Sequence, residues 1–249
     1  MRRMLFRDVA EGIHRLEIAH TNTYLVETGD RLLVVDAGLP AAWPHLLLAV
    51  RDLGYSPSRV EGLLLTHGHF DHVGTAARMR REWGTPVYVH PGDAPLAASP
   101  YSYRPESNRL GFVATHPGGL LPLGRMLLAG AATVPGVSDT LPLESRAEVP
   151  GSPWIIETPG HTDGHVALHF AGRDAVIVGD ALVTFDPYTG GIGPRIVAPA
   201  ATADVDTAVA SLDLLVDTEV QHVLPGHGPA WSGGVRAAVA QARRAAGAA

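Results

Sequence analysis

Alternating hydrophobic and polar positions predict the first strands of the chain. Residues 13–18 and 23–28 alternate in this way, which is typical of antiparallel strands with one buried face. Gly29 and Asp30 predict a turn, and the more continuously apolar residues 32–36 predict a third strand. The chain therefore begins as an antiparallel sheet.

Helical spacing and short apolar runs follow in turn. The pattern predicts a helix over 41–53, a buried strand over 60–65, a second helix over 72–83 and a short strand over 87–89. A glycine follows each predicted helix, as is common at helix C-termini. This order indicates an α/β unit.

The same order returns in the C-terminal part of the chain. Strands are predicted at 154–158, 166–170, 175–178 and 220–224, and helices at 202–216 and 232–246. Asp204 and Asp206 are expected in the first turn of helix 202–216, where the helix dipole favours acidic groups. We therefore predict an α/β fold with two similar halves, each with helices on the outer face of a sheet.

Residues 91–150 interrupt this order. They are rich in Pro, Gly, Ser and Ala, and they contain Tyr101, Tyr103 and an apolar stretch at 120–132. Strand signals are weak here and resume afterwards. We therefore predict a single domain over 1–249, in which 91–150 is inserted as a cap segment over the functional site, because long segments in enzymes are often lids or substrate-binding loops.

The stretch from Thr66 to Gly74 follows a buried apolar run and reads Thr-His-Gly-His-Phe-Asp-His-Val-Gly. It places three imidazoles and one carboxylate within six residues, namely His67, His69, Asp71 and His72. A strand ending in such a cluster delivers metal ligands to the edge of a sheet. Imidazole nitrogen and carboxylate oxygen suit zinc and neighbouring divalent metals.

Three later strand ends present one further candidate ligand each. These are His161 after strand 154–158, Asp180 after strand 175–178 and His227 after strand 220–224. A single histidine at a strand end is more often a surface or hydrogen-bonding residue than a ligand. Four strand ends that share the pattern reverse this judgement, and we predict a metal site.

Composition limits the remaining choices. The 249-residue chain has no cysteine, which excludes thiolate metal sites, disulfides and cysteine nucleophiles. All 19 basic residues are arginine, so a lysine nucleophile is excluded, and the formal net charge is -6. Nucleic-acid-binding surfaces usually show a basic excess. We therefore expect a small-molecule substrate and no nucleic-acid partner.

The chain shows no sign of membrane insertion or export. No segment has the length and apolar character of a membrane span, and the basic N-terminal residues lack the apolar core of a signal peptide. We therefore expect a cytoplasmic protein without a membrane partner. The apolar cap segment also offers a surface for a homodimer, so the oligomeric state is left open.

The ordered strand-end residues resemble the metallo-β-lactamase superfamily. The family's His-x-His-x-Asp-His motif matches His67, His69, Asp71 and His72, and its later single ligands match His161, Asp180 and His227 in order. The resemblance extends from Asp36-Ala37-Gly38 to the last Pro-Gly-His. It implies an αββα sandwich, in which two mixed β-sheets pack face to face with helices on the outer faces.

The resemblance also implies a division of the ligands between two metal ions. By this likeness His67, His69 and His161 hold the first ion, Asp71, His72 and His227 hold the second, and Asp180 bridges the two. We expect both ions to be Zn²⁺, although iron or manganese suits the same donors.

A two-metal centre of this kind implies a hydrolase. Two divalent ions lower the pKa of a shared water, so that a metal-bridging hydroxide is available near neutral pH to attack a carbonyl carbon or phosphorus. Asp71 is expected both to ligate and to pass a proton to the leaving group. The apolar character of the cap segment favours a small carboxylic ester, lactone or thioester.

Four further residues have competing interpretations. Tyr188 follows Asp180 by eight residues. Lactonases of the family use a tyrosine soon after the bridging aspartate to stabilise the oxyanion, and Tyr188 is a candidate for this role. The other interpretation is that Tyr188 packs in a Pro/Gly loop. Asp36 either caps the following helix or supports a ligand by a hydrogen bond. His165 is expected to shape its loop, and His90 faces either the site or solvent.

Other reactions use the same types of donor. The alternatives are a mononuclear iron oxidoreductase resembling persulfide dioxygenases of this fold, and a hydrolase of β-lactams or phosphodiesters. The acidic, lysine-free chain disfavours a phosphodiester because phosphate backbones need cationic partners. A non-enzymatic scaffold would be expected to have lost ligands, and none is lost here.

Overall fold

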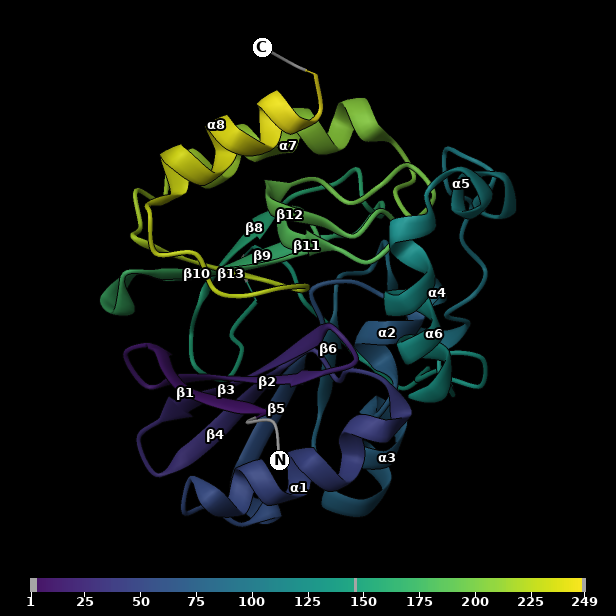
Figure 1. The fold of residues 1–249 in the computed structure, drawn as a ribbon. Coiled ribbons are helices and arrows are strands. Elements are labelled where there is room, and N and C mark those ends of the chain that lie inside the picture. Colours follow the sequence, from purple (N-terminus) through teal and green to yellow (C-terminus); the bar gives the residue numbers. More distant parts are fainter. Residues whose placement is uncertain (1–3, 146, 248–249) are drawn as a thin grey trace.

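Two β-sheets face each other at the centre of the computed structural model, which describes residues 4–145 and 147–247 (Figure 1). The larger sheet contains, side by side, β1 (Leu5–Ala10), β2 (Ile13–Ile18), β3 (Thr21–Thr28), β4 (Arg31–Val35), β5 (Val60–Leu64), β6 (Val87–Val89) and β7 (Leu141–Pro142). Its strands are antiparallel from β1 to β4 and parallel from β4 to β7.

The smaller sheet has the order β13 (His222–Pro225), β10 (Ala175–Gly179), β9 (Val166–Phe170) and β8 (Trp154–Glu157). In it β10 and β13 are parallel, and the other neighbours are antiparallel. A separate hairpin joins β11 (Val183–Asp186) to β12 (Gly191–Arg195). Both main sheets are therefore mixed, as predicted.

Helices cover the outer face of each sheet (Figure 1). The larger sheet is covered by α1 (Trp43–Asp52) and α3 (Ala76–Trp83), and the smaller sheet by α7 (Val205–Val216) and α8 (Val235–Ala245). The short helix α2 (Phe70–Val73) follows β5. Figure 1 also shows α4 (Ala94–Ala98), α5 (Arg109–Thr115) and α6 (Leu120–Leu128) together at one end of the sandwich.

Alternate side chains of the central strands enter different cores. Leu63 and Leu65 pack with α1 and α3, whereas Leu64 between them packs against the other sheet. In β10, Ile177 faces the larger sheet, and Val176 packs with α7 and α8. Because both faces are covered at these positions, residues 63–65 and the residues of β10 form continuous apolar runs. The predicted αββα sandwich is confirmed.

One predicted helix, 72–83, is divided in the structure. At the break, the Gly74 N–H donates to the Gly38 carbonyl at 2.7 Å, and the Thr75 hydroxyl donates to the Ala37 carbonyl at 2.7 Å. A Cβ on residue 74 would lie 2.4 Å from the Gly38 oxygen. The close approach of another backbone therefore replaces hydrogen bonds that a continuous helix would make.

The local pattern also missed or misplaced some elements. The β11–β12 hairpin lies in a stretch that Pro and Gly mark as a loop, but its strands pair from Val183 with Arg195 to Asp186 with Gly191. Helix α7 begins at Val205, and Asp204 is its N-cap rather than part of its first turn, since the Asp204 carboxylate accepts a bond from the Thr207 N–H.

The described residues of the predicted cap segment, 91–145 and 147–150, are tied to the larger sheet. β7, near the C-terminal end of this segment, pairs with β6, and Met126, Val134 and Val137 join the core beneath α1 and α3. The longest helix in the described part of the chain is α7, with 12 residues, and none there is long and apolar enough to cross a membrane.

Truncation of Leu64 tests the core between the sheets. Leu64 is fully buried, so we expect Leu64→Ala to lower the free energy of unfolding by about 2–5 kcal/mol, through lost burial and the cavity that remains. Leu48→Ala, at a site that is 53% exposed on α1, should change it by less than about 0.5 kcal/mol. Equal changes in the free energy of unfolding for the two variants, measured by chemical denaturation, would contradict this assignment of the core.

Candidate metal centre

The ends of β5, β8, β10 and β13 meet at one edge of the sandwich. The loops that follow are joined by backbone hydrogen bonds, from Val166 N–H to the Thr66 carbonyl at 2.9 Å and from Gly226 N–H to the Gly179 carbonyl at 2.7 Å. All seven predicted ligands lie at this edge and are at most 6% exposed: His67, His69, Asp71, His72, His161, Asp180 and His227. The structure therefore brings together the whole predicted set.

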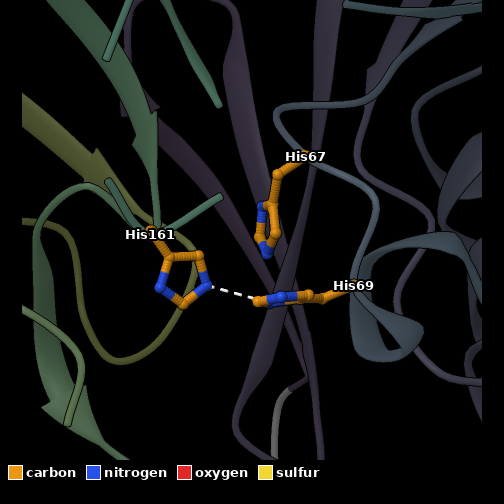
Figure 2. A group of neighbouring side chains, drawn as sticks. All are labelled: His67, His69 and His161. Atoms are coloured by element: carbon orange, nitrogen blue, oxygen red, sulfur yellow. Dashed lines mark hydrogen bonds between the residues drawn. The ribbon is translucent and has the colours of Figure 1, made fainter. Parts of the chain in front are cut away.

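The donor atoms of these side chains form three overlapping groups, each able to hold a metal ion. Within each group the candidate ligand atoms lie within 4.8 Å of one another, and the groups are His67 with His69 and His161, His67 with His72 and Asp180, and Asp71 with His72 and His227. The first and last groups have the composition predicted for the two metal sites. Figure 2 shows the rings of His67, His69 and His161 turned toward a common point.

Asp180 lies between the two outer groups. Its Oδ2 is 3.5 Å from His161 Nε2 and 3.2 Å from His227 Nε2, and its Oδ1 is 3.6 Å from His72 Nε2. One carboxylate therefore reaches histidines of both groups, as a bridging ligand must.

Several inward-facing atoms have the properties expected of metal ligands. Within the described residues, His67 Nε2, His72 Nε2 and Asp180 Oδ1 are buried and have no hydrogen-bond partner. A buried polar atom that lacks a partner costs about 1–3 kcal/mol. Three such atoms directed at one space fit cations, which would satisfy all of them at once.

Hydrogen bonds on the opposite side of the imidazoles direct Nε2 toward the centre. His72 Nδ1–H donates to Asp36 Oδ2 and His227 Nδ1–H donates to the His20 carbonyl, both at 2.8 Å. The Thr66 hydroxyl donates to Asp36 and accepts from His67 Nδ1–H at 3.0 Å. Because Nδ1 is the donor in each of these hydrogen bonds, Nε2 is the nitrogen left to bind a metal, which would displace any proton there.

Asp36 supports candidate ligands and does not cap a helix. Its carboxylate accepts bonds from the Thr66 N–H, the Thr66 hydroxyl and His72, and it is 1% exposed. Helix α1 begins later, and its N-cap Ala42 makes no side-chain cap. Of the two interpretations of Asp36, the structure thus selects the hydrogen bond to a ligand.

His165 shapes the site as expected, through Asp180. Its Nδ1–H donates to the Thr158 hydroxyl at 2.8 Å, and its Nε2 accepts the Asp180 backbone N–H at 3.1 Å. Burial, helped by His161, lowers the pKa of His165 to about 3. The ring is therefore neutral, as an acceptor at Nε2 requires. His90 is half-buried and lies outside the three groups, with its Nε2 3.9 Å from Glu157.

The two outer groups differ in their protonation. Burial lowers the pKa of His67 well below its usual value and that of His161 to about 4, so both rings are neutral. Burial also disfavours a charged His72, but Asp36, Asp180 and Asp71 outweigh it and raise its pKa to about 9. The pKa of His227 is likewise raised, because Asp180 and Asp71 outweigh burial. Protons on His72 and His227 therefore balance the carboxylates in the metal-free protein.

The two carboxylates at the centre stay ionised. Burial by itself would raise the pKa of Asp71 and of Asp180. The charges of His72 and His227 outweigh burial at both carboxylates, and the pKa of Asp71 and the pKa of Asp180 are lowered. Asp71 Oδ2 lies 3.3 Å from His227 Nε2.

A narrow cavity of about 10 Å³ adjoins the centre. Asp71 lines it together with Tyr188, and the predicted cap segment contributes Tyr103 and Met126. Tyr188 is 8% exposed, and its backbone N–H donates to the buried Asp186. Tyr188 thus packs in its loop and borders the cavity, and its role at the oxyanion stays a prediction.

Sequence reasoning missed two residues at the centre. The Tyr103 ring lies 3.9 Å from the His69 ring, centroid to centroid. Asp93 is 1% exposed and hydrogen-bonds to the loops that carry His69 and His161. A signal for Asp93 was present, because Pro91-Gly92-Asp93 follows a predicted strand just as Pro-Gly-His does at His161 and His227.

Comparisons with known sequences show the family and relatives of the chain. A model of the metallo-beta-lactamase superfamily matches residues 18–227. The probable metallo-hydrolase YflN of Bacillus subtilis is 26% identical over 233 residues, which cover 89% of this chain and 85% of the relative. The probable metallo-hydrolase YqgX of the same species is 29% identical over 213 residues, with coverage of 84% and 85%.

Solved structures are similar as well. The crystal structure of TTHA1623 in a di-iron-bound form is 30% identical in sequence, has a TM-score of 0.60, and is matched over 90% of this chain and 95% of that one. The metallo-beta-lactamase family protein TTHA1429 of Thermus thermophilus is 23% identical, with a TM-score of 0.68 and coverage of 96% and 80%. At 23% identity, the similarity to TTHA1429 shows the fold alone.

The protonation pattern predicts that the two groups bind zinc with different pH dependence. A metal must displace the protons of His72, whose pKa is about 9, and of His227, whose pKa is raised. Affinity at the group with Asp71 should therefore rise from pH 6 toward pH 9, by up to about tenfold per unit for each displaced proton. The zinc affinity of the group with His161, whose ring is already neutral, should change little with pH.

Zinc titration against a competing chelator at several pH values checks this expectation. If the zinc affinities of the two groups vary equally with pH, or do not vary, the assigned protonation is contradicted.

Proposed function

The chain belongs to the metallo-β-lactamase superfamily, and from this premise we propose that it is a dinuclear metal-dependent hydrolase of a small carboxylic ester, lactone or thioester. The observation that carries the proposal is the pair of complete ligand groups, one with His161 and one with Asp71, that Asp180 connects. A single-metal enzyme would need only one of these groups.

In this proposal the residues divide as the spacing of their atoms suggests. His67, His69 and His161 would hold one ion and Asp71, His72 and His227 the other, and Asp180 reaches histidines of both groups. Two bound divalent ions would supply an acidic water as nucleophile and would polarise the carbonyl under attack.

Asp71 is the proposed proton carrier. Its carboxylate borders the cavity, and its lowered pKa keeps it ionised and able to accept a proton at neutral pH. This carboxylate could take up the proton released by the attacking water and deliver it to the oxygen or sulfur of the leaving group. Tyr188 borders the same cavity, and its hydroxyl is the proposed donor to the oxyanion.

The lining of the cavity supports an uncharged acyl substrate. Besides the polar centre, the lining residues are apolar or aromatic, among them Phe70, Met126 and Val197. None of the described residues that line it is an arginine, which is unfavourable for a phosphodiester. Because Tyr103 and Met126 come from residues 91–150, we propose that this segment is the cap that excludes water and selects the substrate.

Iron is the main alternative to zinc. TTHA1623, which is 30% identical, has been crystallised in a di-iron-bound form, and histidine with carboxylate suits iron as well as zinc. Iron in the natively purified protein, together with oxygen consumption on a persulfide, would favour an oxidoreductase over a hydrolase.

Removal of His69 tests the metal dependence. Protein purified without added metal should contain about two ions per chain and cleave esters, lactones or thioesters in a screen that includes β-lactams and phosphodiesters. His69→Ala should lose one of the two ions. Its activity should fall by more than the roughly 10–100-fold decrease that removal of a ligand-supporting residue causes. His222→Ala, at the start of β13 and outside the three groups, is the matched control. A His69→Ala variant that is active without bound metal would contradict the proposal.

Removal of the Tyr188 hydroxyl tests its proposed role. If this group stabilises the oxyanion, Tyr188→Phe should lower kcat by about 10²–10³-fold with little change in KM. Tyr55→Phe makes the same chemical change in a residue whose hydroxyl donates to the Gly29 carbonyl, and should leave kcat unchanged. Full turnover by Tyr188→Phe would leave this tyrosine with a packing role only.

A further inference from the structure

A buried carboxylate outside the ligand set joins the two loops of the first group. Asp93 Oδ2 accepts the Gly68 N–H at 2.7 Å and the Thr162 hydroxyl at 2.8 Å, and Oδ1 accepts the Gly164 N–H at 2.8 Å. Gly68 lies between His67 and His69, and Thr162 directly follows His161. One carboxylate therefore binds both segments that supply this group.

Asp93 does not have the usual role of an aspartate at its position. It is the N-cap residue of α4, where an aspartate normally accepts a bond from the first turn of its own helix. Its side chain makes no such bond and is directed to the other loops instead. Burial raises the pKa of this carboxyl against the effect of its hydrogen bonds, so its charge depends on those donors.

Glycines permit the close approach of these loops. A Cβ on Gly68 would lie 2.7 Å from the Ala97 nitrogen, and a Cβ on Gly164 would lie 2.5 Å from the Asp93 nitrogen. Backbone thus packs on backbone on both sides of Asp93. The donors are held at fixed positions, which makes the three hydrogen bonds a rigid connection.

The other group has separate supports. His72 is oriented by Asp36, and His227 by the His20 carbonyl, and neither contacts Asp93 in the hydrogen bonds described above. At the first group, His69 Nδ1 and His161 Nε2 lie 2.9 Å apart although they are 92 residues apart in sequence. That spacing depends on how the two loops are joined.

We propose that Asp93 is a positioning residue specific to the His67, His69 and His161 group, and that it sets the distance between the two loops so that their histidines can share one ion. The proposal rests on the proposed two-metal centre. It assigns to Asp93 an effect on one metal site and not on the other.

The test uses the isosteric variant Asp93→Asn, whose amide cannot accept all three bonds because its NH₂ faces one of the N–H or O–H donors. It is made in a His227→Ala background, which keeps the first group intact, and in a His69→Ala background, which keeps the second. Zn²⁺ affinity is measured by chelator competition, and Co²⁺ spectra report the geometry of the remaining site. Circular dichroism and thermal melting of the metal-free proteins verify folding.

In the His227→Ala background, Asp93→Asn should weaken Zn²⁺ binding by about 10–100-fold, and in the His69→Ala background it should have little effect. Thr162→Val removes one of the three bonds and keeps the carboxylate, so it should cause a smaller loss, roughly fivefold, in the first background. This variant keeps the test decisive if Asp93→Asn fails to fold. Asp163→Asn removes an exposed neighbouring charge and should change neither affinity.

Two results would overturn the inference alone: unchanged Zn²⁺ affinity in the His227→Ala background, or equal losses in both backgrounds, which would make Asp93 a general support of the fold. If the unaltered protein binds no metal ion, the proposed function fails as well. The failures of the two proposals are therefore distinguishable.

Discussion

The structure depends on the burial of ionisable side chains at the edge of an apolar sandwich. Asp36, Asp71 and Asp180 lie together with imidazoles, each at most 6% exposed, where an unpaired charge would be strongly destabilising. In the metal-free protein, protonated His72 and His227 compensate these carboxylates. Bound cations would do the same and would also satisfy the Nε2 atoms that have no hydrogen-bond partner among the described residues.

The surrounding fold makes this burial possible because it holds each ligand from behind. Most of the supporting contacts connect loops from different strands: Asp36 to His72, the His20 carbonyl to His227, His165 to the backbone of Asp180, and Asp93 to the loops of His69 and His161. The two sheets provide a rigid base for these loops, since their strands are packed on both faces.

The candidate metal centre and residues 91–150 would contribute different parts of the proposed function. The centre contains the groups proposed to activate water and to transfer a proton, and it is built from the ends of the sheet strands. Tyr103 and Met126 come from residues 91–150 and border the cavity beside Asp71. Variation in such a segment can change the substrate without altering the donors at the strand ends.

The sequence by itself determined the order of strands and helices in two α/β halves and the set of clustered side chains, because strand alternation, helical spacing and the His-x-His-x-Asp-His motif are local patterns. The family resemblance carried by that motif then implied the αββα layers. Only the tertiary structure decided which partners hold these side chains. The bonds of Asp93 to Gly68 and Thr162, the helix break at Gly74 and the β11–β12 hairpin arise where distant backbones approach each other. Local periodicity does not contain such approaches, since they follow from how whole sheets and loops pack.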